Sequence, residues 1–480
     1  MRTLIRILVI FGALLGGGLS WVWAADNAWV RYNYWPFFFY QKSADKRAWE
    51  LEIVGPFYYR YFSPEEEGSS LRPLISTVKR KKGREIFFLS PLGHYFRGET
   101  FSRFRLVPLF AHDVIHDQGP GESHHSFALI FWGETKRGKY GGFFPFYGTL
   151  KDWGFRDEVT FFLWPLYIHS QYDGNDSYTL LWPFFNRTKG PSVQQFKIWP
   201  LYGHRVKRGE SDRTFFLWPF FWHEKYSLSG ENFGEKDMFL PFWIREKSPF
   251  LERYVFLWPF FQYSKSEDIR WVSVDFPWPF FRYIEGTYDK ERRLWPLIGF
   301  TESESITKAR CHWHFFLWPF YFYERCEIPN QKPKEILKIE NRRFLLFTKF
   351  ERVEDQKGHL KYQYSRVWPL GVQIKRDNGF ELFYFPAIIP FEDEGMNRNY
   401  GAFLRLYEYI QDPKGFTRSK ALWGFYRHDK APQEEVIDLA FLFTYHRKRE
   451  AKEFTFLKGL IGIGNQKNDY RLKLFYLKIF

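Results

Sequence analysis

A Trp-Pro dipeptide recurs along most of the chain and constrains the fold more than any other feature. It occurs ten times, first at Trp35-Pro36 and last at Trp368-Pro369, and successive copies, degenerate ones included, mostly lie 17 to 23 residues apart. The clearest copies are Trp164-Pro165, Trp182-Pro183, Trp218-Pro219, Trp258-Pro259 and Trp318-Pro319. Repetition at a short fixed period predicts an array of one small structural unit.

Each repeat unit consists of an apolar aromatic segment followed by a polar turn. Residues 213–223 form one such segment, and the Gly-containing stretch 227–237 follows it. Segments of about 10–14 residues without helical periodicity predict successive antiparallel strands, about 24 in all, each with Trp-Pro at its centre. Pro inside a central strand removes a ladder hydrogen bond, so we expect each strand to bend or bulge there. Helices are scarce, and only residues 331–341 could hold a short one.

These patterns predict an all-β fold, an antiparallel up-and-down meander of about 24 strands closed as a large β-barrel. Closure removes the exposed sheet edges, and an up-and-down barrel takes an even number of strands. A large soluble sandwich or solenoid remains the alternative, although its edges would need cover. A propeller is disfavoured because its blades would need about 80 residues, against the ~40–50 of common blades.

The first residues predict export from the cytosol. Arg2 and Arg6 form a basic start, Leu4 to Leu19 is apolar and Gly-rich, and Val22-Trp23-Ala24 offers a small-residue cleavage site. This is the anatomy of a secretory signal peptide over residues 1–24, followed by a single repetitive β domain over 25–480. An uncleaved single-span anchor is the alternative. Strands long enough to cross an apolar band then favour the outer membrane of a Gram-negative bacterium.

Composition narrows the set of partners. Aromatic residues make up 23% of the chain and charged residues 26%, which excludes intrinsic disorder. The formal net charge of +15 favours anionic partners, here outer-membrane lipid or lipopolysaccharide. The basic residues are dispersed among turns rather than gathered in one patch, so we expect no nucleic-acid partner.

The last eleven residues, Tyr470 to Phe480, alternate apolar side chains and end in an aromatic residue. Phe480, Tyr476 and Leu474 carry this alternation, which resembles the closing strand of bacterial outer-membrane β-barrel proteins. The resemblance implies that these residues form a membrane-assembly signal recognised by the barrel-assembly machinery. It covers these residues and the general hairpin pattern.

An alternating assignment of residues 252–263 gives two faces that are both apolar at the centre and more polar at the ends. One face carries Tyr254, Phe256 and Trp258, and the other carries Val255 and Phe261. A water-filled pore would alternate apolar with polar residues. We therefore expect an apolar interior that suits lipidic cargo, or else an inner face that is simply packed core. A wide barrel without a plug segment of its own implies a plug or periplasmic partner protein.

Ligand-like residues gather in one place. His112, His116, His124 and His125 lie with three carboxylates in a predicted loop and could bind Zn²⁺, or they could belong to an ordinary polar loop. We expect no bridge between Cys311 and Cys326 unless the chain folds back at Trp318-Pro319, because an extended segment of 15 residues would hold them too far apart. No nucleophile or phosphate-binding motif appears, so we assign no catalytic residue and no cofactor.

Together these features predict a non-enzymatic outer-membrane β-barrel whose apolar interior takes lipidic or hydrophobic cargo or docks a partner. The alternative is a secreted or periplasmic soluble aromatic β-repeat protein that acts as a binding or structural module.

Overall fold

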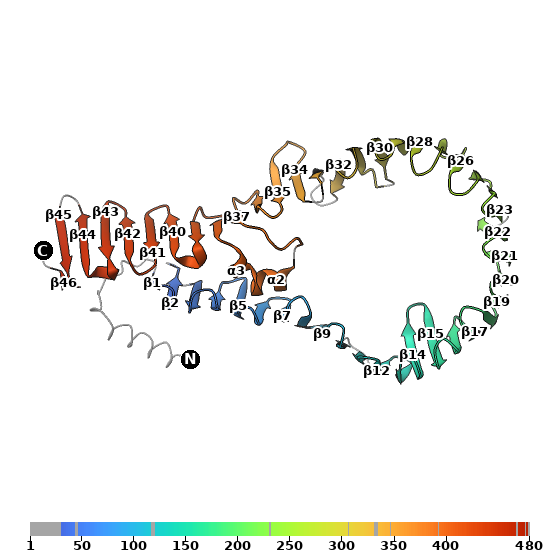
Figure 1. The fold of residues 1–480 in the computed structure, drawn as a ribbon, viewed down its shortest axis with the longest axis horizontal. Coiled ribbons are helices and arrows are strands. Elements are labelled where there is room, and N and C mark those ends of the chain that lie inside the picture. Colours follow the sequence, from blue (N-terminus) through green and yellow to red (C-terminus); the bar gives the residue numbers. More distant parts are fainter. Residues whose placement is uncertain are drawn as a thin grey trace. The chain divides into compact units, whose positions relative to one another are not determined.

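The computed structural model describes residues 30–43, 47–116, 121–229, 232–305, 307–330, 335–345, 347–391, 393–466, 469–475 and 477–478. These residues form 46 strands, two short α-helices and two 3-10 turns (Figure 1), which confirms the predicted all-β antiparallel meander. Residues 1–24, predicted to be a signal peptide, lie outside the described residues, and the division into 1–24 and 25–480 stays a prediction.

The first strands are β1 Val30–Tyr34, β2 Phe38–Lys42, β3 Trp49–Ile53, β4 Tyr58–Phe62, β5 Glu66–Leu71, β6 Ile75–Arg80, β7 Gly83–Phe88 and β8 Gly93–Gly98. The middle strands are β9 Phe101–Leu106, β10 Phe110–Ile115, β11 Glu122–Phe127, β12 Ile130–Thr135, β13 Gly138–Phe143, β14 Tyr147–Trp153, β15 Arg156–Phe162, β16 Tyr167–Tyr172, β17 Asn175–Leu180, β18 Phe185–Lys189, β19 Val193–Ile198, β20 Tyr202–Lys207, β21 Ser211–Phe216, β22 Phe221–Ser229, β23 Asn232–Phe239, β24 Trp243–Lys247, β25 Glu252–Phe256, β26 Phe261–Ser266, β27 Trp271–Asp275, β28 Phe281–Glu285, β29 Asp289–Leu294, β30 Ile298–Glu304, β31 Arg310–Phe316, β32 Tyr321–Asn330, β33 Glu335–Phe344 and β34 Thr348–Glu354.

The last elements are β35 Leu360–Val367, β36 Gly371–Arg376, β37 Glu381–Phe385, α2 Glu394–Asn399, α3 Gly401–Leu404, β38 Tyr407–Gln411, β39 Thr417–Ala421, η1 Leu422–Gly424, β40 Tyr426–Ala431, β41 Glu434–Leu439, β42 Phe443–Lys448, β43 Ala451–Phe456, η2 Leu457–Gly459, β44 Ile461–Gln466, β45 Asp469–Leu474 and β46 Leu477–Lys478. The helix that residues 331–341 could hold is absent where the chain is described, because Glu335–Phe344 is strand β33.

Trp-Pro lies in a turn between two strands and not at the centre of one strand. In the repeat around Trp218, the Phe220 N–H donates to the Leu217 carbonyl over 2.8 Å, which closes a four-residue turn with Pro219 in its third place. The peptide bond before Pro219 is cis, as in type VI turns. The Trp218 N–H donates to the carbonyl of Pro200 in the neighbouring turn over 2.6 Å. Pro therefore occupies a position where the strand ladder needs no donor, and the predicted bend or bulge inside each strand is wrong.

This position of the motif explains the strand count. Each apolar segment contains two strands, mostly of five to seven residues, so the described residues form 46 strands where the sequence predicted about 24. Antiparallel pairing joins each strand to the next within β1–β8, β9–β33 and β35–β46. The sheet is not closed by hydrogen bonds, because in the described part β1 pairs with β2 and β46 with β45 alone, so barrel closure is not confirmed.

The described residues divide into two compact units. Unit 1 holds the residues up to Gly98, Phe347–Glu351 and those from His359 onward, and unit 2 holds Glu99–Leu346 and Arg352–Gly358. In unit 1, strands β1–β3 pack face to face against β39–β41, and helix α2 packs on β5–β7 (Figure 1). In unit 2, packing joins consecutive strands of one sheet.

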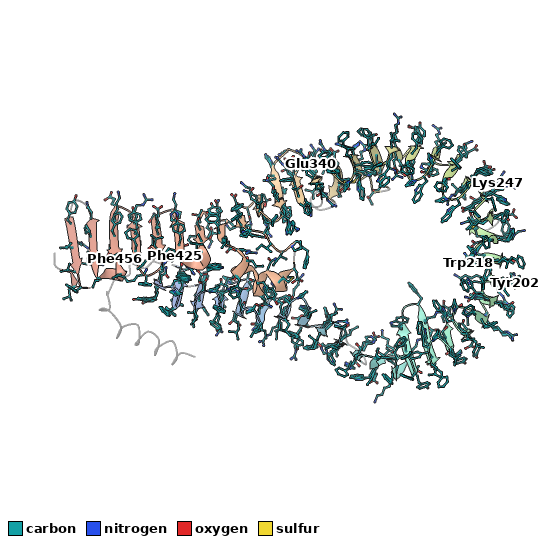
Figure 2. All side chains as sticks on the ribbon, in the orientation of Figure 1. Tyr202, Trp218, Lys247, Glu340, Phe425 and Phe456 are labelled. Carbon is teal, nitrogen blue, oxygen red and sulfur yellow. A yellow bond between two sulfur atoms is a disulfide. The ribbon has the colours of Figure 1, made fainter. Side chains whose placement is uncertain are left out.

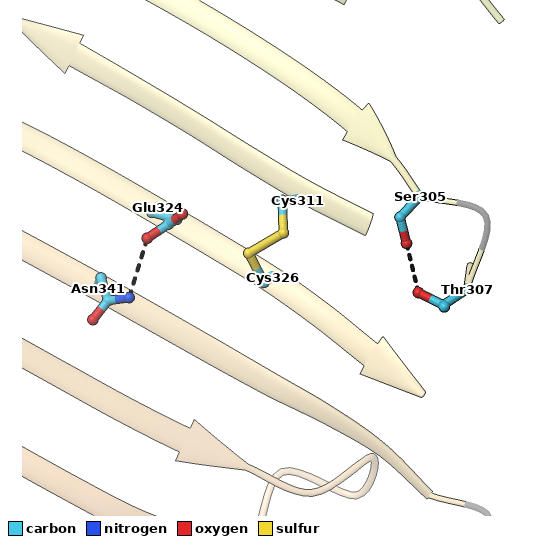
Figure 3. The surroundings of a disulfide bond; sticks show 6 residues. All are labelled: Ser305, Thr307, Cys311, Glu324, Cys326 and Asn341. Carbon is cyan, nitrogen blue, oxygen red and sulfur yellow. Dashed lines mark hydrogen bonds between the residues drawn. A yellow bond between two sulfur atoms is a disulfide. The ribbon is translucent and has the colours of Figure 1, made fainter. Parts of the chain in front are cut away.

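The chain folds back at Trp318-Pro319, which was the stated condition for a bridge between the two cysteines. Cys311 on β31 and Cys326 on β32 lie directly opposite each other, with Cα atoms 4.1 Å apart, and form a disulfide. Figure 3 shows the bridge between the two strands, beside the hydrogen bond from Asn341 to Glu324. The exception stated with the expectation therefore applies, because the segment is a hairpin and not one extended strand.

Candidate functional site

An unbroken line of apolar side chains follows the strand ends next to the Trp-Pro turns of unit 2. We name it the apolar row. Its members, cross-strand neighbours in order, are Leu106, Phe110, Phe127, Ile130, Phe143, Tyr147, Phe162, Tyr167, Leu180, Phe185, Ile198, Tyr202, Phe216, Phe221, Phe239, Trp243, Phe256, Phe261, Phe281, Leu294, Ile298, Phe316, Tyr321 and Phe344. Phe276 links its two halves, since the Phe276 N–H donates to the Phe281 carbonyl and its ring lies 5.0 Å from that of Phe261.

Most of the apolar row is exposed, and so are most tryptophans of the adjoining turns. Phe216, Phe256 and Phe316 of the row are 55%, 60% and 56% exposed. In the turns, Trp164, Trp182, Trp218, Trp258 and Trp318 are between 40% and 53% exposed. The tryptophan rings of neighbouring turns lie close together, with centroids 6.3 Å apart for the stacked pair Trp164 and Trp182 and 5.9 Å apart for the tilted pair Trp295 and Trp318. The predicted repeat motif therefore forms an exposed aromatic edge of the sheet.

A second line of side chains, two residues further from the turns on the same face, is mixed aromatic and basic. We name it the belt. Its members are Phe104, His112, His125, Trp132, Gly141, Thr149, Thr160, His169, Tyr178, Arg187, Phe196, His204, Thr214, His223, Asp237, Arg245, Tyr254, Tyr263, Val274, Tyr283, Arg292, Phe300, His314, Tyr323 and Arg342. It holds four arginines, six histidines and a single carboxylate, Asp237, which His223 contacts at 2.7 Å.

A third line on this face, next to the polar turns, alternates in charge. We name it the charged row: Asp212, Lys225, Glu235, Lys247, Glu252, Lys265, Val272, Glu285, Lys290, Glu302, His312, Arg325 and Glu340. Lys225 pairs with Glu235 at 3.3 Å and Lys247 with Glu252 at 3.2 Å. Figure 2 labels Tyr202 of the apolar row, Trp218 of a turn, and Lys247 and Glu340 of the charged row.

The opposite face of unit 2 is more buried and mostly polar, and it includes a few buried apolar side chains such as Phe161, Val255 and Phe315. One line across it runs through Arg213, Glu224, Lys236, Glu246 and Arg253, and Arg213 contacts Glu224 at 2.5 Å. Beside that line, burial raises the pKa of Asp275, and the nearby Arg282, Arg293 and Arg253 offset this only in part. The prediction of two apolar faces is wrong, because it continued the alternation of even and odd residues through the turn at Trp258-Pro259. Before this turn the even-numbered residues lie on the aromatic face, and after it the odd-numbered residues do.

The structure brings together two of the four predicted metal residues and separates the other two. His112 on β10 and His125 on β11 are cross-strand neighbours of the belt, with ring centroids 4.4 Å apart. His124 points to the other face, where its Nδ1 contacts the Tyr140 hydroxyl, and the Nε2 of His116 contacts the Ser102 hydroxyl at 3.2 Å. Within the described ranges, no group of three or more His, Cys, Asp or Glu side chains could hold a metal ion. The segment is a hairpin and not the predicted loop, and strand alternation separates its imidazoles.

Of the predicted membrane-assembly signal, Leu474 is described and Tyr476 and Phe480 lie outside the described residues. Leu474 ends β45, is 38% exposed and pairs with Ile461 and Leu477. It belongs to the same kind of apolar line as in unit 2, which in this part of unit 1 runs through Leu439, Phe443, Phe456, Ile461, Leu474 and Leu477.

Sequence reasoning missed a buried ion network between the two layers of unit 1. Glu52 on β3 accepts hydrogen bonds from Lys420 Nζ, at 2.7 Å, and from Arg427. Burial would raise the pKa of Glu52, but Arg427 and Lys420 outweigh it and lower that pKa to about 2. Arg31 on β1 contacts Asp429 and, at 2.7 Å, Asp438.

The same network reaches two further bases. Arg418 donates to Asp429 Oδ1 over 2.9 Å and Lys458 to Asp438 Oδ1 over 2.9 Å. Arg418, Lys458 and the two aspartates are each largely buried, so the network replaces an apolar core between these layers. Its members are far apart in the chain, and no local pattern marks them.

Among the described residues, no helix is both long and apolar enough to cross a bilayer.

Comparison with known proteins identifies no family and one short, distant similarity. No known protein family matches the chain. Over 149 residues, which is 30% of this chain, it is 20% identical to a probable serine/threonine-protein kinase of Dictyostelium discoideum. The matched part spans 9% of the length of that protein.

Proposed function

We propose that this chain is a non-enzymatic lipid-binding protein of the Gram-negative outer membrane, whose Trp-Pro edge enters one leaflet of the bilayer. The observation that supports this proposal most strongly is the largely exposed, unbroken apolar row beside the exposed turn tryptophans. Soluble monomers rarely expose a contiguous apolar patch above about 300–600 Å². A large aromatic side chain offers about 150–250 Å², so ten half-exposed members leave roughly 1,000 Å². Such a surface needs an apolar partner.

The order of the three lines supports lipid as that partner. From the turns outward, the face changes from apolar to His, Tyr and Arg, and then to alternating Lys and Glu. Successive lines are two residues apart, about 7 Å along a strand. Proteins that lie in a membrane interface bury their apolar side about 5–10 Å deep and keep amphipathic aromatic and basic side chains at headgroup level. The apolar row with its turns fits that depth, and the belt fits the headgroup level.

The strands favour insertion into one leaflet over a spanning barrel. Strands of five to seven residues rise about 17–23 Å, whereas crossing a bilayer takes about 9–11 tilted residues. Only part of each strand is apolar, which shortens the available band further. Lipid therefore covers the outer aromatic face in this proposal, and the polar opposite face takes no lipidic cargo. A plug partner and the barrel-assembly machinery belong to a spanning barrel, so the proposal does not include them.

A flotation assay with vesicles of outer-membrane phospholipids tests the proposal. The full chain should float with the vesicles, and brominated acyl chains should quench the fluorescence of its tryptophans. Replacing Phe216, Phe220, Phe256 and Phe260 by Gln removes four exposed side chains at the Trp-Pro edge. At about 1 kcal/mol for each half-exposed ring, the partition coefficient should fall by roughly a thousandfold.

The matched control replaces four exposed aromatics near the polar turns, Phe155, Phe233, Phe250 and Tyr288, by Gln. This variant should float like the unaltered chain. Loss of flotation in both variants would mean that apolar content, and not the Trp-Pro edge, drives binding. A full chain that stays in the aqueous phase without quenching would refute the proposal and favour the soluble aromatic β-repeat.

A further inference from the structure

A groove interrupts the aromatic face of unit 2 between β24 and β27. It is open to solvent, has a volume of about 510 Å³ and is mainly apolar. Its lining on this face includes Trp243, Tyr254, Phe256, Phe261 and Tyr263. Volumes of about 300–1,000 Å³ are usual for ligand sites. In the belt, Val274 stands between Tyr263 and Tyr283, so a small side chain replaces a ring at this point.

Arg245 lies at the belt end of the groove and is exposed. It forms no ion pair or side-chain hydrogen bond with any described residue. Its cross-strand neighbours are Asp237 and Tyr254, and the Asp237 carboxylate is engaged by His223 at 2.7 Å. A free guanidinium at the polar end of an apolar groove has the geometry to bind a phosphate oxygen pair.

We infer that this groove is a specific site for one anionic phospholipid, with an acyl chain along Phe256, Phe261 and Tyr263 and the phosphate on Arg245. The inference rests on the proposed function and deepens it, since it distinguishes one bound lipid from general contact with the bilayer. In the belt, Arg187 and Arg245 form no ion pair with a described residue, and the single carboxylate, Asp237, is engaged by His223. This balance of charge selects an anionic headgroup over a zwitterionic one.

The chain supplies a matched control in Arg187. It lies in the same belt between Tyr178 and Phe196, is exposed, and likewise has no ion pair or side-chain hydrogen bond within the described part of the chain. It does not line the groove. If basic side chains attracted lipid only through their general charge, Arg187 and Arg245 would contribute equally to lipid binding. A site in the groove makes Arg245 contribute much more than Arg187.

The experiment measures retention of phosphatidylglycerol by the full chain, using native mass spectrometry from detergent and vesicles with and without that lipid. One phosphatidylglycerol should remain bound per chain. Arg245→Gln should weaken its binding about tenfold, Arg245→Lys should restore part of it, and Arg187→Gln should change it less than twofold. Val274→Trp should fill the groove and abolish retention while flotation persists. Soluble glycerol phosphate should not compete.

Equal losses for Arg245→Gln and Arg187→Gln, or full retention in Val274→Trp, would overturn the site while flotation of the unaltered chain still supports the proposed function. Competition by glycerol phosphate would also overturn it, in favour of a site for a soluble phosphate. Failure of the unaltered chain to float would instead refute the proposed function itself.

Discussion

The buried ion network of unit 1 allows a sharp prediction for Glu52→Gln. Glu52 is 4% exposed and lies between two bases, Lys420 and Arg427. Arg427 is 1% exposed, and its guanidinium lies 3.7 Å from the centre of the Phe39 ring. The amide removes the negative charge and leaves both bases buried without their carboxylate. Unit 1 should therefore lose the contact that joins β3 to β39 and β40.

Two physical arguments give the magnitude. The pKa of Glu52 is about 2, against an ordinary value of 4.5, and the difference corresponds to about 3 kcal/mol. Breaking a buried ion pair by removing one partner costs about 3–5 kcal/mol in other proteins. Because the pKa is lower in the folded state, this contribution is complete above pH 4.5 and is lost as the pH falls to about 2. Glu52→Gln should remove that part of the acid dependence.

Hydrogen exchange read by mass spectrometry is the suitable assay, because it assigns an opening free energy to Trp49–Ile53 without requiring the whole chain to unfold in one step. The control is Asp377→Asn in the same unit, where Lys361 and Asp377 form an exposed pair at 3.4 Å. That change should cost less than about 1 kcal/mol. A loss below about 1 kcal/mol for Glu52→Gln, or equal losses for both variants, would refute the reasoning.

Two further predictions concern single contacts. Asn399 is fully buried and donates from Nδ2 to the Ser90 hydroxyl over 2.9 Å and to the Phe87 carbonyl. Asn399→Ala should cost about 1–3 kcal/mol and raise hydrogen exchange in Glu394–Leu404, because it removes partners from buried polar groups; unchanged exchange there would contradict the role of Asn399 in docking α2. Cys311 and Cys326 should resist maleimide until the protein is reduced, and replacing both by Ser should destabilise the β31–β32 hairpin by up to about 3 kcal/mol, the value for a 15-residue loop. Labelling of either thiol without reductant would show that the bridge is not formed.

The polar turns and the repeat could be recognised in the sequence, but the Trp-Pro turns could not. Residues 214–222 contain no Gly, Asn or Asp, and the turn at Leu217–Phe220 is as apolar as the strands it joins. Pro is normally read as a break within a strand, and here it marks the reversal of the chain. This one misassignment halved the strand count, mixed the two faces and separated Cys311 from Cys326.

The apolar row would follow from the sequence once the turns are placed, whereas the ion network would not. Leu-Trp-Pro-Phe fixes which residues flank each turn, and alternation then assigns Phe216 and Phe221 to one face. Glu52 and Arg427 are separated by 375 positions in the sequence. No residue near Glu52 in the sequence marks it as buried, so only the pairing of two layers reveals the burial of this carboxylate.

In both units the sheet has one aromatic and one mostly polar face, and the charged side chains of the polar face need partners. In unit 1 the polar faces of two layers meet, and charges such as Arg31 and Asp438 pair across them at 2.7 Å. In unit 2 the polar face pairs within its own sheet, as Arg213 does with Glu224 on the next strand. Neither arrangement covers the aromatic face, and among the described residues of unit 2 few apolar side chains are buried. The aromatic side chains that would form a core face outward, so burying them would require an apolar surface outside the chain. In the proposed function, bound lipid is that surface. This accounts for the pattern of the face, which changes from apolar to charged along each strand, while the apolar row continues without a break from strand to strand.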